Sequence, residues 1–482
     1  MTHAMNSEAA GQLGRFALLV RRAARGAALA VLMVGGAAQA DTLADALVGA
    51  YNHSGLLEQN RALLRAADED VASTVAGLRP IINWSADITR SMAYGNRPGG
   101  GTIRTGDTDI NAGITAELLL YDFGQQRLRI DAAKEAVLAT RQTLVSIEQQ
   151  VLLRAVAAYM NVLRNTRFVE LRRSNVRVIN ESLRAARDRF EVGEVTRTDV
   201  AQAEARLASA RSGLANAEGD LNQAIEEYIA SVGKRPGTLA RQPRLPEITR
   251  SVDSAKQVAM RNHPDMLKAQ FDVASADINV LVAEAAVRPR VTLNGSLGVN
   301  EEFNSNNFGQ SATVGVRIGG PIYQGGLLSS TKRRALAQRD ALRGALHVVR
   351  NNVSQNVGVA YAILAATRSS AAASSEAVRA ARVAFDGVRE EAKLGARTTL
   401  DVLNAEQELL DAQANQISAQ ADVFIAAYQV LASTGQLTAR QLNLGFQSYD
   451  PTLYYNLVDD APVPSSQQGK QLDKVLRALG KE

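Results

Sequence analysis

The chain has 482 residues, a formal net charge of +5 and only 5% aromatic residues. It contains no cysteine, which excludes disulfides, thiolate catalysis, thiolate zinc sites and a lipid-modified N-terminal cysteine. The scarcity of aromatic residues and the abundance of Ala, Leu, Gln and Arg favour long, closely packed helices over a thick globular core.

Residues 1–40 have the pattern of a secretory signal peptide, in which basic residues precede a short apolar run and a small-x-small cleavage site. The apolar run covers residues 26–36, and residues 38–40 read Ala-Gln-Ala. A membrane-spanning helix is the alternative interpretation, but the run is too short for one. Removal of this segment lowers the net charge from +5 to +2, so the basic balance is no evidence for nucleic-acid binding.

Residues 43–78 show helical spacing, and Pro80 is expected to end that helix. Two stretches with alternating apolar and polar residues follow, which predicts a β-hairpin. Strands of roughly ten to fourteen residues with this alternation are typical of a lipid-facing barrel, although an ordinary half-buried hairpin also fits. The residues that share the apolar face are Ile82, Trp84, Ala86 and Ile88 in the first stretch and Ile110, Ala112, Ile114, Ala116 and Leu118 in the second.

A very long helix is predicted next, because residues 125–191 contain neither proline nor glycine. Such a helix would be about 100 Å long. Gly193 then marks a tight turn, and a second long helix returns. Its apolar residues recur at alternating steps of three and four, which favours close coiled-coil pairing. These seam residues are Val200, Ala203, Leu207, Ala210, Leu214, Ala217, Leu221, Ala224 and Tyr228.

The second half of the chain repeats this plan, with many matched residues 202 positions apart. Gly193 matches Gly395, and Tyr159 matches Tyr361. We therefore interpret residues 41–234 and 251–436 as two structural repeats joined by a linker at 235–250. Residues 437–460 form a closing segment, and the Pro/Ser/Gln-rich tail 461–482 is predicted to be mobile and dispensable.

Each repeat thus supplies one hairpin, and the chain supplies four strands. Four strands cannot close a barrel that leaves no exposed edge. Because open sheet edges are not tolerated in lipid, a membrane-spanning role requires several chains. The predicted fold class is an α+β membrane protein that combines a transmembrane antiparallel β-barrel with long antiparallel coiled-coil helices and an internal duplication.

At this point the sequence resembles the TolC family of outer-membrane efflux and secretion ducts. The resemblance covers roughly residues 41–457 and depends on the order, spacing and duplication of short motifs. Residues 449–456, YDPTLYYN, are similar to the closing segment of members paired with type I secretion systems. The other motifs are LYDFG at 120–124, GGPIYQGG at 319–326, VGEVTRTDVAQAEARL from Val192 and LGARTTLDVLNAEQEL from Leu394.

The resemblance implies a homotrimer whose twelve strands form one barrel in the outer membrane of a Gram-negative bacterium. The helices would continue as an α-helical barrel across the periplasm. The implied partners are a periplasmic adaptor (membrane fusion protein) and an inner-membrane ABC or proton-driven transporter, which supplies the energy. The cargo would be proteins, small toxic compounds or both, and no cofactor is implied.

The resemblance also implies a gate at the periplasmic helix turns, which Gly193 and Gly395 mark. Arg397 matches an arginine that meets an aspartate on the first turn, and Asp199 matches that aspartate. Asp401 matches an aspartate that faces the entrance, where three copies would repel one another and raise its pKa. An alternative explanation is that both aspartates are first-turn charges that favour the helix dipole.

Two gate positions depart from the family pattern. Asn404 stands where the type member has a second aspartate, and Ala392 stands where it has a tyrosine. The second acidic ring and the tyrosine contact are therefore absent, and Glu391 and Glu194 are candidates to compensate.

The remaining conspicuous residues have structural explanations. The four histidines are scattered, and the sequence has no phosphate loop or nucleophile motif, so we predict no metal site, no cofactor and no enzymatic activity. A periplasmic coiled-coil adaptor or scaffold without a channel is the alternative function. The predicted strand-to-helix corners are Pro80, Tyr121, Gly124, Pro289, Pro321 and Gly325.

Overall fold

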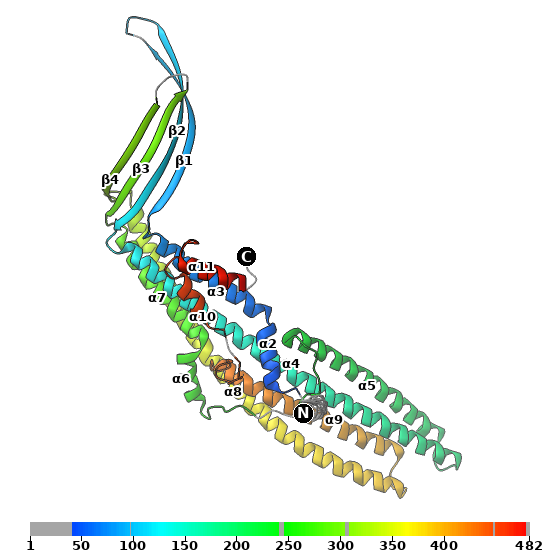
Figure 1. Cartoon of the computed structure of the whole chain (residues 1–482). Coiled ribbons are helices and arrows are strands. Elements are labelled where there is room, and N and C mark those ends of the chain that lie inside the picture. Colours follow the sequence, from blue (N-terminus) through cyan, green and yellow to red (C-terminus); the bar gives the residue numbers. More distant parts are fainter. Residues whose placement is uncertain (1–40, 97, 241–244, 304–307, 447–448, 479–482) are drawn as a thin grey trace, which may run out of the picture.

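The computed structural model describes residues 41–96, 98–240, 245–303, 308–446 and 449–478. The predicted signal peptide lies outside the described residues. Two very long helices run from a curved sheet at one end to two helical hairpins at the other (Figure 1). No helix among the described residues is long and apolar enough to cross a membrane.

The first repeat begins with helices α2 (Leu43–His53) and α3 (Gly55–Ala76). The helical spacing of residues 43–78 predicts a single helix, but Ser54 has an extended backbone and interrupts it. The Ser54 side chain caps α3 by accepting a hydrogen bond from the Leu57 amide. The second repeat has the same break between α6 (Val252–Asn262) and α7 (Pro264–Ala285), where His263 is the N-cap. Pro264 at the first helical position fits this start.

The four predicted strands are present and form one antiparallel sheet in the order β1-β2-β3-β4. Strand β2 is paired with β3, so the sheet continues across the two repeats, and β1 and β4 are its edges. The bounds are β1 (Ile81–Asn96), β2 (Thr102–Tyr121), β3 (Arg290–Phe303) and β4 (Phe308–Gly319).

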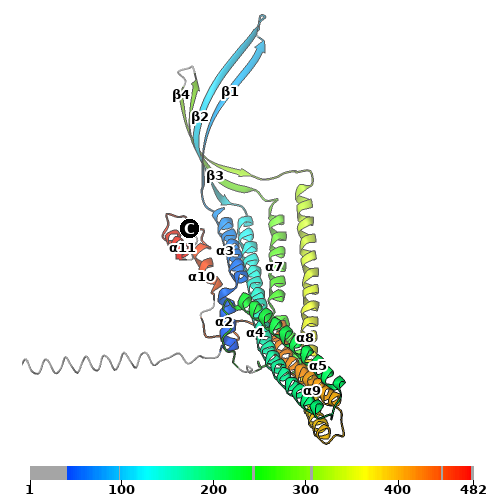
Figure 2. The ribbon, with the colours of Figure 1, turned by 90° about the vertical axis from the view of Figure 1, so that its right-hand side faces the viewer.

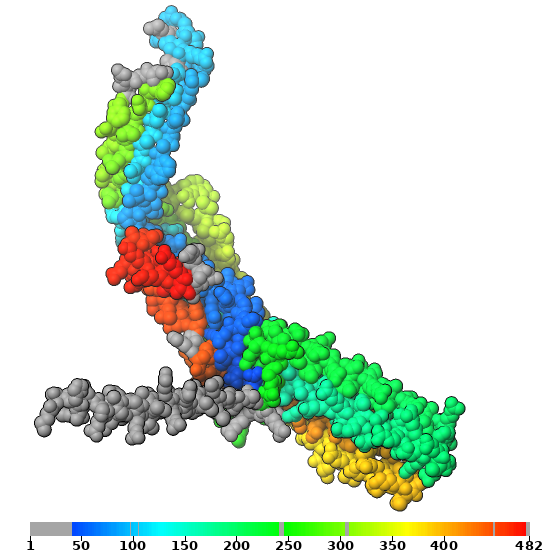
Figure 3. Space-filling view, turned by 45° about the vertical axis from the view of Figure 1, so that its right-hand side comes forward, coloured from blue at the N-terminus to red at the C-terminus, as the bar shows by residue number. Residues whose placement is uncertain are grey.

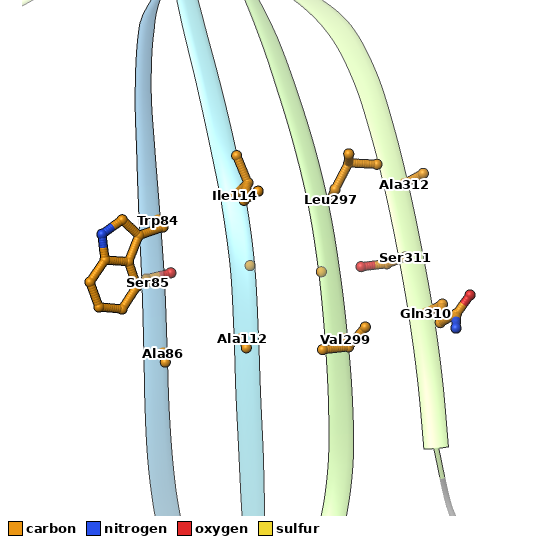
Figure 4. Close-up of a pocket in the computed structure, with 12 residues that line it drawn as sticks. Trp84, Ser85, Ala86, Ala112, Ile114, Leu297, Val299, Gln310, Ser311 and Ala312 are labelled. Carbon is orange, nitrogen blue, oxygen red and sulfur yellow. The ribbon is translucent and has the colours of Figure 1, made fainter.

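One face of the sheet is apolar, as the alternation predicts. The register aligns Trp84, Ile114 and Leu297 across β1, β2 and β3. Figure 4 shows these side chains projecting from neighbouring strands, and they are exposed in the single chain. The opposite face carries Asp87, whose carboxylate accepts a hydrogen bond from Asn111. An exposed apolar face of this kind requires a lipid or protein environment.

The corners between strands and helices follow the predicted positions. Pro80 and Pro289 directly precede β1 and β3, Tyr121 ends β2, and Pro321 follows β4. Gly124 and Gly326 are the left-handed N-caps of the two long helices, with φ of 85° at both. The predicted Gly325 is also left-handed, but its counterpart 202 positions earlier is Phe123, which adopts a φ of 56°.

The two long helices are α4 (Gln125–Glu191) and α8 (Leu327–Lys393), and both have 67 residues. Each returns through a tight turn into a shorter helix, α5 (Arg197–Val232) or α9 (Thr399–Ser433). The seam of α5 is buried as predicted, including Ala203, Leu207 and Tyr228. In α9, Gln416 stands 202 positions after the seam residue Leu214, and it donates a hydrogen bond to Ser375 of α8.

The closing segment holds α10 (Pro451–Val458), and the tail holds α11 (Gln467–Ala478). The tail was predicted to be mobile, but it forms a helix whose Leu472 and Leu476 pack against Tyr454 and Val458. Figure 3 shows this red segment lying against the orange closing segment below the sheet. Two leucines four residues apart share a helix face, which gives the tail an apolar side to bury.

Candidate functional site

The candidate site is the end of the molecule farthest from the sheet, where the α4–α5 and α8–α9 turns lie (Figure 1). Gly193 and Gly395 have φ values of 78° and 79°, a left-handed conformation that glycine adopts at little cost. In the first turn, the amides of Gly193 and Glu194 donate to the carbonyls of Phe190 and Arg189. The second turn repeats this arrangement, so both helices end in a Schellman motif.

The two aspartates belong to capping boxes, in which a threonine is the N-cap and the aspartate is the third helical residue. The carboxylate of Asp199 accepts hydrogen bonds from the amide and hydroxyl of Thr196, and Thr196 in turn accepts from the Asp199 amide. Asp401 and Thr398 form the same capping box at the start of α9. The helix-terminal explanation of these residues is therefore observed directly within the single chain.

These caps set the direction of the pKa shifts in the single chain. Hydrogen bonds from Thr196 hold the pKa of Asp199 below its ordinary value. Bonds from Thr398 and the nearby Arg397 charge lower the pKa of Asp401. Repulsion among three Asp401 copies, as the resemblance implies, would act against this lowering.

Arg397 is bound within its own turn. Its Nε donates to Glu391 at 2.8 Å, and both side chains are about half exposed. The structure gives no hydrogen bond or ion pair between Arg397 and Asp199, both of which are described. Glu391, one of the two candidates to compensate for the missing contacts, is thus the partner of Arg397, whereas Glu194 lies 4.0 Å from Arg189.

The two hairpins are joined near their tips by hydrogen bonds that the sequence does not predict. Asn404 accepts a hydrogen bond from Arg206 of α5 at 2.9 Å. Two residues further along α9, buried Glu406 accepts from Asn175 of α4 at 3.0 Å. The repeat alignment pairs residues with their duplicates, so it carries no signal for a bond between residues that are not duplicates of each other.

A cavity of about 370 Å³ lies between α4, α8 and α9 beside these bonds. Its wall includes Phe385, Leu403 and Ala392, so alanine at the position of the family tyrosine borders this space. Charged side chains also line it, among them Arg389 and Glu406. The tip is therefore a loosely filled helical junction with several charges within reach of one another.

This architecture agrees with comparisons to known proteins. The family model "Outer membrane efflux protein" matches residues 48–234 and 255–436, more than half of the chain. The chain belongs to the outer membrane efflux protein family. It is 37% identical over 431 residues to the outer membrane efflux protein BepC of Brucella suis, covering 89% of this chain and 93% of that relative.

More distant members of the family share the same fold. The chain is 26% identical over 402 residues to the outer membrane protein TolC of Vibrio cholerae, covering 78% of this chain and 86% of TolC. The Campylobacter jejuni CmeC outer membrane channel superposes with a TM-score of 0.71 at 16% identity, covering 88% of this chain and 90% of CmeC. As an efflux family member the chain is a non-enzymatic transport protein of the outer membrane, which confirms the predicted family, fold class and localisation.

Proposed function

We propose that three copies of this chain form one channel-tunnel, in which their sheets close a β-barrel and their helices enclose a duct across the periplasm. The observation that carries this proposal is the sheet itself. It has four strands, one apolar face and two unpaired edges, β1 and β4. These edge strands are antiparallel to each other through β2 and β3, so copies can continue the sheet edge to edge without reversing direction.

The outer face of α8 supports assembly as well. Val348, Val359, Ile363 and Val383 are substantially exposed along this helix. Exposed apolar residues repeated along one long helix favour contact with another protein surface. A neighbouring copy would cover them in a closed ring.

The duct would receive its cargo from a periplasmic adaptor and an inner-membrane ABC or proton-driven transporter docked at the helical tips. The name of the relative BepC, an outer membrane efflux protein, supports an efflux role. The similarity of residues 449–456 to members of type I secretion systems supports protein export. The same duct serves either cargo, because the energy and the selection come from the pump.

We propose further that the helix turns form the periplasmic gate. The exposed turn residues Asp199, Arg397, Asp401 and Asn404 would meet the turns of neighbouring copies around the axis. In this arrangement the Arg397–Glu391 bond holds the second turn to the end of α8. The contact of Arg397 with Asp199 would then form between adjacent copies.

Conductance of the purified protein in a planar bilayer tests both the proposed duct and the proposed gate. The wild type should conduct weakly, and Arg397→Ala should raise the conductance several-fold because its turn is released. Arg379→Ala is the matched control, since Arg379 forms an exposed ion pair with Glu376 higher on α8. It should behave as the wild type.

Three results separate the alternatives. Conductance that Arg397→Ala does not change would retain the duct and remove the gate assignment. Folded trimers that never conduct would favour the scaffold function. A rise in both arginine variants would mean that α8 is destabilised generally and that the turn has no special role.

A further inference from the structure

The two repeats use a matched acid in different ways. In the first repeat, Glu204 of α5 pairs with Arg187 of α4 at 2.6 Å, and both side chains are about half exposed. The residues 202 positions later are Glu406 of α9 and Arg389 of α8. No ion pair joins these two described residues, although both line the same cavity.

Glu406 is instead turned into the junction between the hairpins. Only 6% of its surface is exposed, and its Oε1 accepts from Asn175 at 3.0 Å. Its Oε2 is buried and has no hydrogen-bond partner among the described residues. A buried carboxylate oxygen without a partner is costly, so this arrangement favours a protonated acid.

The cavity between α4, α8 and α9 contains a second possible partner for Glu406, and it has space for the Glu406 side chain to move. Its other charged lining residues are Glu181 and Arg189 of α4 and Lys393 of α8. Arg189 lies near Glu194, and Lys393 is bonded to Glu390 at 2.6 Å. On the α5 side, Arg206 is bonded to Asn404. Arg389 is therefore the cation in register with Glu406, as Arg187 is with Glu204.

We propose that Glu406 is a positioning residue of the gate, which holds α9 to α4 through Asn175 and moves to Arg389 of α8 when the hairpins separate. This inference rests on the proposed gating at the helix turns. In the second state, the α8–α9 hairpin would have the internal ion pair that the α4–α5 hairpin already has. The first repeat thus shows the acid paired with arginine inside its own hairpin, and the second repeat shows the matched acid bonded to the other hairpin.

Burial raises the pKa of Glu406 to about 7 from an ordinary value near 4.5. The junction therefore binds a proton more tightly than a solvated carboxylate does. The buried position of Glu406 is most stable at low pH, because the effect of burial exceeds that of the Asn175 bond, which favours the ionised form. As the pH rises toward about 7, the ionised form gains from moving to Arg389. Between pH 6 and pH 8 the opening equilibrium should shift by up to about tenfold per chain.

Spin-label distances between the two turns test the switch without requiring transport. The chain has no cysteine, so Thr198→Cys and Leu400→Cys place labels at matched, exposed positions in the first turns of α5 and α9. In the full-length protein the intra-chain distance should lengthen or broaden between pH 6 and pH 8. Glu406→Gln should keep the short distance at both pH values, because glutamine still accepts from Asn175 and cannot ionise.

Further variants distinguish a switch from a general loss of packing. Asn175→Ala should lengthen the distance at both pH values, and Arg389→Ala should suppress the change at pH 8. Glu204→Gln is the matched control in the first repeat and should follow the wild type. A distance that stays constant with pH in the wild type, or a pH response that survives in Glu406→Gln, would overturn the proposal.

Bilayer conductance at the same two pH values separates this switch from the proposed function. The wild type should conduct up to about tenfold more at pH 8, and Glu406→Gln should lose this dependence. If the protein conducts but the spin-label distance does not change with pH, the Glu406 switch is rejected and the proposed duct is retained. Folded protein that shows the distance change but never conducts would reject the duct and keep the switch.

Discussion

Helices α4 and α8 are matched in length and position, yet they are buried to very different extents. Twenty residues of α4 are buried against only four of α8. Helix α4 packs against α3, α5, α7 and α9, whereas α8 has α7, α9 and the short α6 as its main neighbours. Figure 2 shows α8 at one side of the molecule, with α7 between it and the upper part of α4.

The side chains follow this difference in position. Exposed Val348, Ile363 and Val383 of α8 correspond to Ser146, Asn161 and Glu181 of α4. The duplicated helix at the edge has thus kept apolar residues where the central helix has polar ones. Because exposing apolar side chains to water is unfavourable, this surface supports the proposed assembly, in which a neighbouring copy covers α8.

Placing a charge on this face of α8 should have the largest effect. Ile363→Asp would bury an unpaired carboxylate in the proposed contact between copies, at a cost of several kcal/mol per chain. We expect trimers in detergent to be lost, as measured by light scattering. Asn161→Asp at the matched position of α4 should leave the trimer intact. Trimers that survive Ile363→Asp would show that another surface joins the copies.

A second comparison concerns the matched tyrosines of the two long helices. The fully buried hydroxyl of Tyr159 lies 3.1 Å from the carbonyls of Asp41 and Ala240, whereas Tyr361 donates to Thr249 at a more exposed site. Tyr159→Phe should lower the free energy of unfolding by about 1–3 kcal/mol, and Tyr361→Phe by about 1 kcal/mol or less. Thermal unfolding followed by circular dichroism would measure both, and equal losses would contradict this account of their burial.

The smallest difference is expected at the two turns, where the repeats are most alike. Gly193→Ala and Gly395→Ala each place a Cβ in a left-handed conformation, and no atom lies within contact distance of the added carbon. Each should cost about 1 kcal/mol through backbone strain alone. Hydrogen exchange at the two helix ends would report the loss. A much larger loss in one turn would show that the repeats differ there too.

The regular part of the fold could be predicted from the sequence because its signals are local. Pro80 and Pro289 precede strands, and Gly193 and Gly395 follow long helices, so proline and glycine mark most boundaries. The alternation of apolar and polar residues predicted the strands. Matched residues 202 positions apart indicated the duplication. The break at Ser54 was missed because capping by serine is a weaker signal than proline, whereas Pro264 marks the matching break at His263.

The tip could be predicted only in part, because its contacts depend on which helices are neighbours. The turn glycines and the capping role of Asp199 and Asp401 follow from local sequence. The partner of Arg397 does not, since Glu391 competes for it at short range. The local sequence does not distinguish Glu406 from its duplicate Glu204, because the Asn175 that bonds to Glu406 belongs to the other repeat.

The central claim, that copies of this chain close one barrel, is tested most directly by cross-linking the two sheet edges. The absence of cysteine allows single cysteines to be placed along β1 and β4, in pairs that scan the unknown register between copies. After oxidation, denaturing gels should show a ladder of one, two and three chains that ends at three for pairs in register. Cross-linking confined to one chain, or a ladder that continues beyond three, would contradict the trimeric barrel.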